Sequence, residues 1–142
     1  MNTDRFKFRA WNKKERKYYY DIEDAYSNDS HACSDIPDNR LHFPDYHYFF
    51  GSIIEDPGYI VEQCTGLKDK NGKLIYEGDV VRYYRSTAMC LGGERIAQVL
   101  WDERDAEFGI LTTLGDGYIM WEALRFGIEI IGNIHDMESE ND

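Results

Sequence analysis

The dipeptide Asn71-Gly72 stands between two short runs that are rich in β-branched and aromatic residues, residues 59–65 and 73–76. Asn-Gly is the pair that most readily supplies the two successive positive φ angles of a type I′ turn. A two-residue turn of this type joins antiparallel strands, whose side chains alternate between two faces. The sequence therefore predicts a β-hairpin with Asn71-Gly72 at its tip, and antiparallel sheet as the basis of the fold.

The tripeptide Glu77-Gly78-Asp79 follows this hairpin directly and predicts a second reversal of the chain. Gly78 tolerates a positive φ, and the carboxylate of Asp79 can accept hydrogen bonds from backbone N–H groups. Residues of this kind have mechanical reasons for their positions and need no substrate to explain them. We expect Asn71, Gly72, Gly78 and Asp79 to be structural turn residues.

Short strand-like runs separated by turn residues recur along the rest of the chain. Residues 5–22 are predicted to form a β-hairpin, because charged and apolar residues alternate before a polar turn and a second strand-like run follows it. Residues 23–42 lose this periodicity and are interpreted as a loop or insertion. Residues 46–135 are predicted to form a β core, and residues 136–142 a flexible acidic tail. We expect one domain over residues 1–142 with a mostly β fold, built as small antiparallel barrels or packed sheets with at most one or two short helical turns.

Composition and charge exclude several classes of protein. Hydrophobic residues make up 42% and aromatic residues 15% of the chain, which supports a packed core and argues against a disordered chain. Lys+Arg number 16 and Asp+Glu 27, so the formal net charge is −11 and opposes sequence-independent binding to a phosphate backbone. No apolar run approaches ~18 residues and the first residues lack an apolar h-region, so neither a transmembrane helix nor a signal peptide is expected. Cys33, Cys64 and Cys90 are odd in number and widely spaced, which is typical of reduced thiols in the cytoplasm.

Three segments carry a resemblance to a known family: residues 7–12 (KFRAWN), 64–81 (CTGLKDKNGKLIYEGDVV) and 129–136 (EIIGNIHD). In this order and spacing they resemble the YopX protein family, which is found in bacteriophages and in prophages of Gram-positive bacteria. The resemblance implies a β-rich fold built around barrel-like, SH3-like strands. It implies no catalytic role and no cofactor. Residues 136–138 depart from the usual ending of the family, and residues 23–42 have no counterpart in it.

His31 and Cys33, with Asp29 and Asp35, form the one place where residue types that bind metals cluster in the sequence. A structural zinc site needs three or four donors at ordered spacings, and a second pair of ligands is missing elsewhere in the chain. A polar loop that contains His and Cys incidentally explains the same residues. We favour the polar loop and expect no metal site.

His42 and His47 flank Asp45, a pattern in which a carboxylate could orient an imidazole for acid–base chemistry. The spacing specifies no shared face, and we favour histidines packed within an aromatic cluster as the explanation of the pattern. The sequence contains no Gly-x-Ser-x-Gly, no Gly-x-Gly-x-x-Gly and no Walker pattern. We therefore expect no catalytic residue, no cofactor and no enzymatic activity.

Successive aromatic residues occur in two places, at Tyr18-Tyr19-Tyr20 and in the run from Tyr46 to Phe50. Neighbours in a strand point to opposite faces, so both faces of such strands are apolar. The outer rings are then covered either by a second sheet or by another subunit. The sequence predicts an interaction surface, for a protein partner or for a second copy of the chain, that consists of Tyr18, Tyr20, Tyr46, Tyr48 and Phe50.

A nucleic-acid-linked role is the alternative function. A local basic patch beside two tyrosines can bind single strands through charge and base stacking. The residues concerned are Arg5, Lys7, Arg9, Lys68, Lys70, Lys73, Tyr83 and Tyr84. Charged side chains that protect strand edges explain the same lysines and arginines. An acidic face can also imitate DNA as a decoy for a DNA-acting host enzyme, although the sequence shows no regular array of carboxylates.

The function predicted from the sequence is that of a non-enzymatic phage or prophage accessory protein. We expect it to act in the cytoplasm through protein–protein contacts, with another protein or with itself as a homo-oligomer. A membrane is not an expected partner, and nucleic acid is the less favoured one. The alternative is a weak single-strand binder or an acidic decoy.

Overall fold

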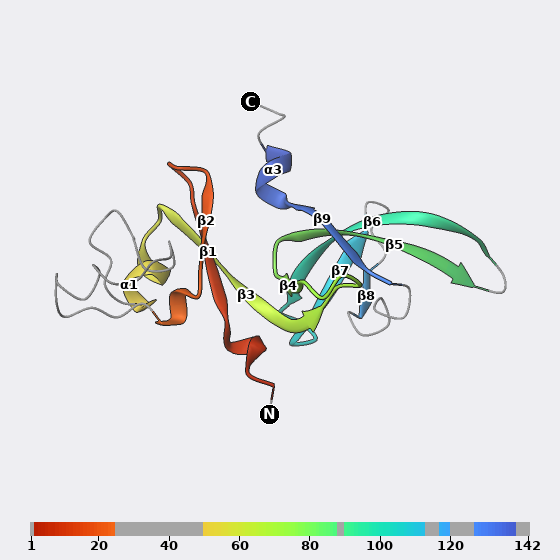
Figure 1. Cartoon of the computed structure of the whole chain (residues 1–142), viewed down its shortest axis with the longest axis horizontal. Helices are drawn as coiled ribbons and strands as arrows, with labels where there is room; N and C mark the ends of the chain where they lie inside the picture. Colours follow the sequence, from red (N-terminus) through yellow and green to blue (C-terminus); the bar gives the residue numbers. More distant parts are fainter. Residues whose placement is uncertain (1, 25–49, 88–89, 113–116, 120–126, 139–142) are drawn as a thin grey trace. The chain divides into compact units, whose positions relative to one another are not determined.

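Short antiparallel strands form most of the computed structural model, which describes residues 2–24, 50–87, 90–112, 117–119 and 127–138 (Figure 1). The chain divides into two compact units, Met1–Cys64 and Thr65–Asp142. Each unit has a hydrophobic core of its own. Among the helices within the described ranges, none combines the length and the apolar character that crossing a bilayer requires.

The N-terminal unit contributes β2, β1 and the first part of β3 to a four-stranded sheet of order β2-β1-β3-β4, and it also contains a short α-helix. Its elements are η1 (Asp4–Phe6), β1 (Phe8–Asn12), β2 (Lys17–Tyr20), η2 (Ile22–Asp24), α1 (Phe50–Glu55) and the first part of β3 (Tyr59–Lys68). The turn between β1 and β2 is held by Asn12, whose Oδ1 accepts hydrogen bonds from the backbone N–H groups of Lys14 and Glu15, both at 3.0 Å. This is the hairpin chemistry that the polar residues of the segment favour.

The core of the N-terminal unit lies on one face of these strands. Ala10 of β1 stands opposite Tyr19 of β2 and Val61 of β3, so the three side chains share a face. The buried cluster consists of Ala10, Tyr19, Ile22, Ile53 and Tyr59, with Phe8, Phe50 and Val61 packed against it. Burial of a side chain such as Ile53 contributes roughly 1.5–3 kcal/mol, so α1 is stabilised by its packing rather than by its own short length.

The C-terminal unit contains a five-stranded antiparallel sheet in the order β8-β7-β6-β5-β9. Its elements are the last part of β3, then β4 (Leu74–Tyr76), β5 (Asp79–Thr87), β6 (Cys90–Asp102), β7 (Glu107–Thr112), β8 (Gly117–Ile119), β9 (Glu129–Asn133) and α3 (Ile134–Glu138). The predicted fold class, mostly β with antiparallel sheets, is confirmed; among the described residues the α-helices are the short α1 and α3, beside the single 3-10 turns η1 and η2.

Alternation along β5 and β6 decides which residues form the second core. Val81 of β5 stands opposite Ala97 of β6, and Val99 of β6 stands opposite Ile110 of β7. The buried cluster consists of Ile75, Val81, Tyr83, Ala97, Val99, Ile110 and Ile128, with Leu67, Phe108 and Ile130 packed against it. The residues between these positions point to the opposite face of the sheet.

The β3–β4 hairpin is present, but its turn differs from the predicted two-residue type I′ turn. Gly72 has a φ of 82°, whereas Asn71 is not among the non-glycine residues with positive φ, so the two successive positive angles are not formed. The Gly72 N–H donates to the Asp69 carbonyl (3.0 Å) and the Asp69 N–H to the Lys73 carbonyl (2.8 Å). This is a three-residue loop with a glycine bulge, the next most common hairpin connection.

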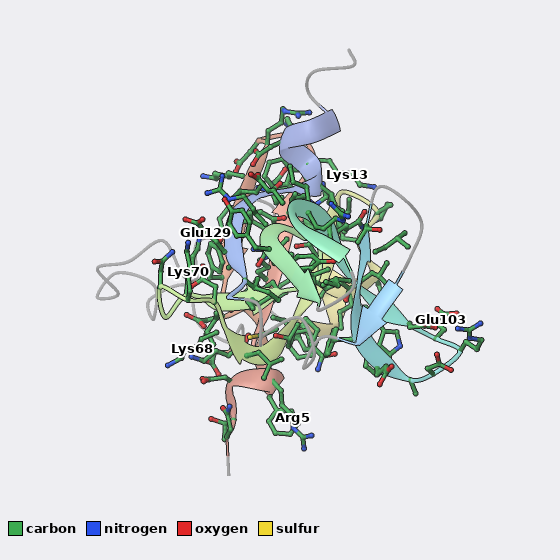
Figure 2. The ribbon with its side chains drawn as sticks, turned by 90° about the vertical axis from the view of Figure 1, so that its right-hand side faces the viewer. Arg5, Lys13, Lys68, Lys70, Glu103 and Glu129 are labelled. Carbon is green, nitrogen blue, oxygen red and sulfur yellow. The ribbon has the colours of Figure 1, made fainter. Side chains whose placement is uncertain are left out.

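Asp69 is the reason for the longer turn, and it also ties the hairpin to β9. Its Oδ1 accepts hydrogen bonds from the N–H groups of Asn71 and Lys73, both at 2.9 Å, and its Oδ2 accepts one from the Ile130 N–H at 3.2 Å. The neighbouring Lys70 N–H donates to the Ile128 carbonyl, and its Nζ lies 3.2 Å from an Oε of Glu129 (Figure 2). The corner is therefore fixed by a side chain that the Asn-Gly pattern does not include.

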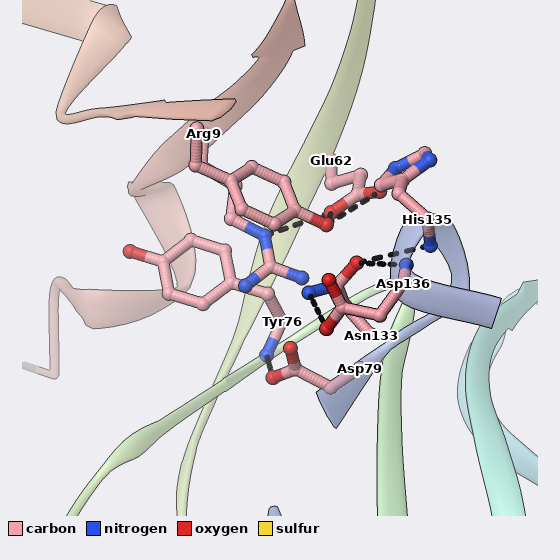
Figure 3. A network of polar contacts seen from close by, with 8 residues as sticks. Arg9, Glu62, Tyr76, Asp79, Asn133, His135 and Asp136 are labelled. Carbon is pink, nitrogen blue, oxygen red and sulfur yellow. Dashed lines mark hydrogen bonds and ion pairs between the residues drawn. The ribbon is translucent and has the colours of Figure 1, made fainter. Parts of the chain in front are cut away.

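The second reversal, at Gly78 and Asp79, has the chemistry expected of it. Gly78 has a φ of 86°, and Asp79 Oδ2 accepts a hydrogen bond from the Tyr76 N–H at 2.8 Å (Figure 3). The Gly78 N–H also donates to the Val99 carbonyl, and its carbonyl accepts from the Ile134 N–H, both at 2.9 Å. This turn thereby joins β6 and the start of α3.

A helix, α3, occupies positions where the sequence predicts the end of a strand followed by a flexible tail. Asn133 caps it, because its Oδ1 accepts hydrogen bonds from the N–H groups of His135 (2.9 Å) and Asp136 (3.1 Å). The Asn133 Nδ2 donates in turn to Asp136 Oδ2 at 2.7 Å (Figure 3). Asn followed by Asp three residues later resembles the capping pattern of a helix N-terminus, and this feature was available in the sequence.

Candidate functional site

The face of the N-terminal unit opposite its core carries aromatic and charged side chains in register. Arg9 of β1 stands opposite Tyr20 of β2 and Glu62 of β3, and Trp11 stands opposite Tyr18. Residues that are paired directly, or two apart along one strand, share a face. We call this set, Arg9, Trp11, Tyr18, Tyr20 and Glu62, the aromatic face.

A buried ion pair forms the centre of the aromatic face. The Arg9 Nε lies 2.7 Å from Glu62 Oε2, and the two residues are only 4% and 2% exposed (Figure 3). The Tyr18 hydroxyl donates to the same Oε2 at 3.0 Å, and the Arg9 guanidinium carbon lies 4.0 Å from the centre of the Tyr18 ring. A buried charge pair is tolerated only when further hydrogen bonds satisfy it, and Tyr18 provides one of them.

The rings continue outward from this pair. The centres of Trp11 and Tyr18 lie 4.9 Å apart in an edge-to-face contact, and those of Tyr18 and Tyr20 lie 5.9 Å apart. Trp11 is 8% exposed, Tyr18 is half-buried and Tyr20 is 40% exposed. Aromatic pairs at such separations are favourable beyond the area they bury. The aromatic face therefore presents Tyr20 at its rim, ordered by a buried base of Trp11, Tyr18 and the ion pair.

Three titratable groups in or near the β1–β2 hairpin, Glu15, Tyr19 and Glu23, have shifted pKa values. The Tyr19 hydroxyl donates to Glu15 Oε2 at 2.5 Å, and this bond lowers the pKa of the Glu15 carboxyl. Burial is the main cause that raises the pKa of the Tyr19 phenol. Burial likewise raises the pKa of Glu23, although its Oε2 accepts the Phe8 N–H at 3.0 Å. Each of these carboxylates is engaged in holding the hairpin.

The structure brings together only part of the predicted interaction surface. Tyr18 and Tyr20 share the aromatic face, as strand alternation requires. Phe50 does not join them: it is the first residue of α1 rather than the end of a strand, and its ring lies 4.9 Å from that of Phe8 against the core. Its placement in a strand was wrong, because a run of aromatic residues does not distinguish a strand from the start of a helix. Tyr46 and Tyr48 lie outside the described residues.

The candidate metal and acid–base residues also lie outside the described residues; they are Asp29, His31, Cys33, Asp35, His42, Asp45 and His47. Within the part of the chain that the structure describes, no three His, Cys, Asp or Glu side chains cluster in a way that could hold a metal ion. Cys64 and His135 are described and both are buried, at 0% and 1% exposure. Neither side chain is accessible to a substrate from solvent.

Several residues of the predicted basic patch are buried or paired with carboxylates. Tyr83 is 2% exposed and belongs to the core, whereas Tyr84 is 56% exposed, because neighbours in β5 point to opposite faces. The prediction that both tyrosines could stack on bases is therefore wrong. Arg9 is buried in its ion pair with Glu62, and Lys70 pairs with Glu129.

The Arg9–Glu62 pair is the part of the site that sequence reasoning missed. The sequence places Arg9 among basic residues on a solvent-facing side, and it places Glu62 within a β-rich run without a role. The two residues lie 53 positions apart and meet only through the β1–β3 register. The available indication of the pair was that each of two strand-like apolar runs contains a charged residue in its middle, Arg9 in one and Glu62 in the other.

The chain was compared with known proteins. A family model described as YopX protein matches residues 7–139. The crystal structure of protein EF1440 from Enterococcus faecalis is similar to this chain, with 23% sequence identity, a TM-score of 0.54, and coverage of 96% of this chain and 97% of that one. At this identity the likeness shows the fold alone. No curated protein matches the chain.

Proposed function

Because the chain belongs to the YopX protein family, we propose that it is a non-enzymatic accessory protein of a bacteriophage or prophage. It acts in the bacterial cytoplasm by binding another protein. The phage association follows from the family resemblance, and the mode of action follows from the aromatic face.

The observation that carries the proposal is the exposed ring of Tyr20 above a rigid base. Tyr20 is 40% exposed, and its neighbour Tyr18 is held by Glu62 and Arg9. Aromatic residues that are ordered before binding lose little conformational entropy on association, and they are enriched at protein interfaces. A face built in this way favours contact with a protein over chemistry on a small molecule.

Nucleic acid is disfavoured as the partner by charge and by the burial of Tyr83. The formal net charge of −11 repels phosphates, and Tyr83 offers no ring to a base. Filter binding of single-stranded DNA across a salt series tests this alternative. Retention at low salt that falls steeply as salt rises would establish nucleic-acid binding and count against the proposal.

The experiment that tests the proposal has two stages. The purified protein is coupled to beads, host lysate is passed over it, and retained proteins are identified by mass spectrometry. A purified candidate is then titrated by calorimetry against the unmodified protein and against the variants Tyr20→Ala and Trp101→Ala. Trp101 is the matched control, because it is 43% exposed but lies in the C-terminal unit.

We expect Tyr20→Ala to weaken binding at least ~10-fold, as is typical of an exposed aromatic side chain that a partner covers, and Trp101→Ala to leave it unchanged. Circular dichroism of both variants checks that the fold is retained. Equal binding by all three proteins would show that the aromatic face is not the contact. Turnover of a nucleotide or phosphoester that is lost on changing one residue would overturn the non-enzymatic assignment.

A further inference from the structure

The five-stranded sheet of the C-terminal unit has an outer face, opposite its core, that carries exposed apolar side chains. Tyr84 of β5, Ile96 of β6 and Leu111 of β7 are 56%, 40% and 44% exposed. Their neighbours along the strands, Tyr83, Ala97 and Ile110, are buried in the core. The exposed positions are therefore not frayed ends of the sheet, but the regular outward half of three paired strands.

These side chains form one continuous stripe. Arg82 stands opposite Ile96, and Tyr84 stands opposite Glu94, so Tyr84 and Ile96 are diagonal neighbours on one face. Gln98 stands opposite Leu111, which places Ile96 and Leu111 in the same diagonal relation. Diagonal neighbours lie roughly 7–8 Å apart, within reach of large side chains. We call Tyr84, Ile96 and Leu111 the outer stripe.

Ion pairs of balanced charge border the outer stripe. The Arg82 Nη2 lies 2.6 Å from Glu129 Oε2, and its Nη1 lies 3.8 Å from Glu94 Oε1. Lys70 Nζ lies 3.2 Å from the same Glu129 oxygen (Figure 2). Two cations and two carboxylates cancel, so this border is neutral in a chain whose formal net charge is −11. The hydrogen bond from Arg82 also lowers the pKa of the Glu129 carboxyl.

We propose that the outer stripe is where two copies of this chain associate, stripe against stripe about a two-fold axis. Two molecules that each carry −11 repel one another over most of their surface, and a neutral apolar patch is where they can approach. A basic partner would instead be drawn to acidic parts of the surface. Two-fold symmetry also forms every contact between the two borders twice, because the same patch serves both copies. This inference is independent of the protein partner proposed for the aromatic face.

The size of the outer stripe sets the expected affinity. A standard interface buries ~800 Å² on each partner, and three side chains on a flat sheet supply only part of that area. We therefore expect association with a dissociation constant on the order of tens of micromolar rather than nanomolar. The monomer–dimer equilibrium should be visible when the protein concentration is varied across that range.

Sedimentation equilibrium of the full chain, from about 1 to about 200 μM, tests the proposal. The variants are Ile96→Glu and the matched control Ile54→Glu, the same substitution at an isoleucine of α1 that is 54% exposed. Leu111→Glu, on a different strand, is the second test variant. Circular dichroism and thermal melting establish that each variant is folded.

We expect the unmodified protein and Ile54→Glu to move from 16.7 kDa toward twice that mass as concentration rises. Ile96→Glu and Leu111→Glu are expected to weaken dimerisation at least ~10-fold, because each buries two carboxylates at a two-fold interface. A protein that stays at 16.7 kDa throughout would overturn the proposal. So would dimers that the two stripe variants leave intact, or that Ile54→Glu disrupts to the same extent. If one stripe variant fails to fold, the other decides between these outcomes.

Discussion

Asp69 holds the corner between β3 and β4, and replacing it gives the most quantitative test of the fold. Its carboxylate accepts hydrogen bonds from the N–H groups of Asn71, Lys73 and Ile130, and the residue is only 7% exposed. Asp69→Ala removes both acceptor oxygens and with them all three hydrogen bonds. Asp69→Asn keeps one amide oxygen but turns an NH₂ group toward one of the donors.

The expected magnitude follows from where the three donors lie. Asn71 and Lys73 are exposed at the loop tip, so water replaces the carboxylate there at little cost. Ile130 is half-buried in β9, and leaving a buried N–H unsatisfied costs ~1–3 kcal/mol. With the loss of two exposed bonds to a charged group, we expect Asp69→Ala to lower the free energy of unfolding by about 3 kcal/mol. Asp69→Asn should lower it by roughly half as much.

Urea denaturation followed by circular dichroism measures this free energy, and amide hydrogen exchange at Ile130 localises the effect. Asp105→Ala is the matched control, because the Asp105 side chain is 52% exposed and its ion pair is with its sequence neighbour Arg104. The control is expected to fall within about 0.5 kcal/mol of the unmodified protein. If Asp69→Ala is as stable as Asp105→Ala, the corner is held by the glycine turn alone and this reasoning fails.

Three further changes test other parts of the structure. Gly72→Ala should lower the free energy of unfolding, measured by urea denaturation, by about 1 kcal/mol. The reason is backbone strain, because a side chain at a φ of 82° is strained even though nothing lies within 4 Å of the added Cβ. An unchanged free energy would show that the left-handed turn is not needed. Asn133→Ala removes the cap of α3 and should lower the free energy of unfolding by about 1 kcal/mol, with faster amide exchange at Asp136, whereas Asn133→Asp keeps the acceptor but replaces the donor to Asp136 Oδ2 with a carboxylate oxygen and should recover only part of that stability. Glu129 has a pKa in the folded state below its ordinary value because Arg82 donates to it, so its stabilising contribution is present at neutral pH and is lost as the pH falls below ~4. The difference in melting temperature between the unmodified protein and Glu129→Gln, measured from pH 7 to pH 3, should therefore shrink as the pH falls. A difference that stays constant over this range would contradict the assignment.

The sequence predicts strands and turns well where a short stretch of neighbouring residues determines them. The β1–β2 hairpin and the reversal at Gly78 follow from short patterns, and both are present. The form of the β3–β4 turn could not be predicted from Asn71-Gly72, because a carboxylate outside that pair competes for the same N–H groups. Local propensity lists the turns that a segment allows, and a neighbouring side chain selects one of them.

The candidate surfaces were only partly predictable for a different reason. Tyr18 and Tyr20 are two residues apart on one strand, so alternation alone places them on one face. The Arg9–Glu62 pair and the outer stripe depend on which strands become neighbours and in which register. A single sequence does not contain that information in any local window, and a one-residue change of register would reverse both faces.

The strand β3 runs for ten residues across the boundary between the two units, with Gly66 at a φ of 82° just beyond it. The boundary between the two units therefore falls inside a strand, and neither half of the coding sequence encodes complete secondary-structure elements only. When related genes exchange segments, a crossover at this midpoint must keep the number of residues in the strand unchanged. One inserted or missing codon would move every later side chain of the strand to the opposite face. Breakpoints that natural recombination tolerates should accordingly fall in the loops and be rare at the centre of the coding sequence.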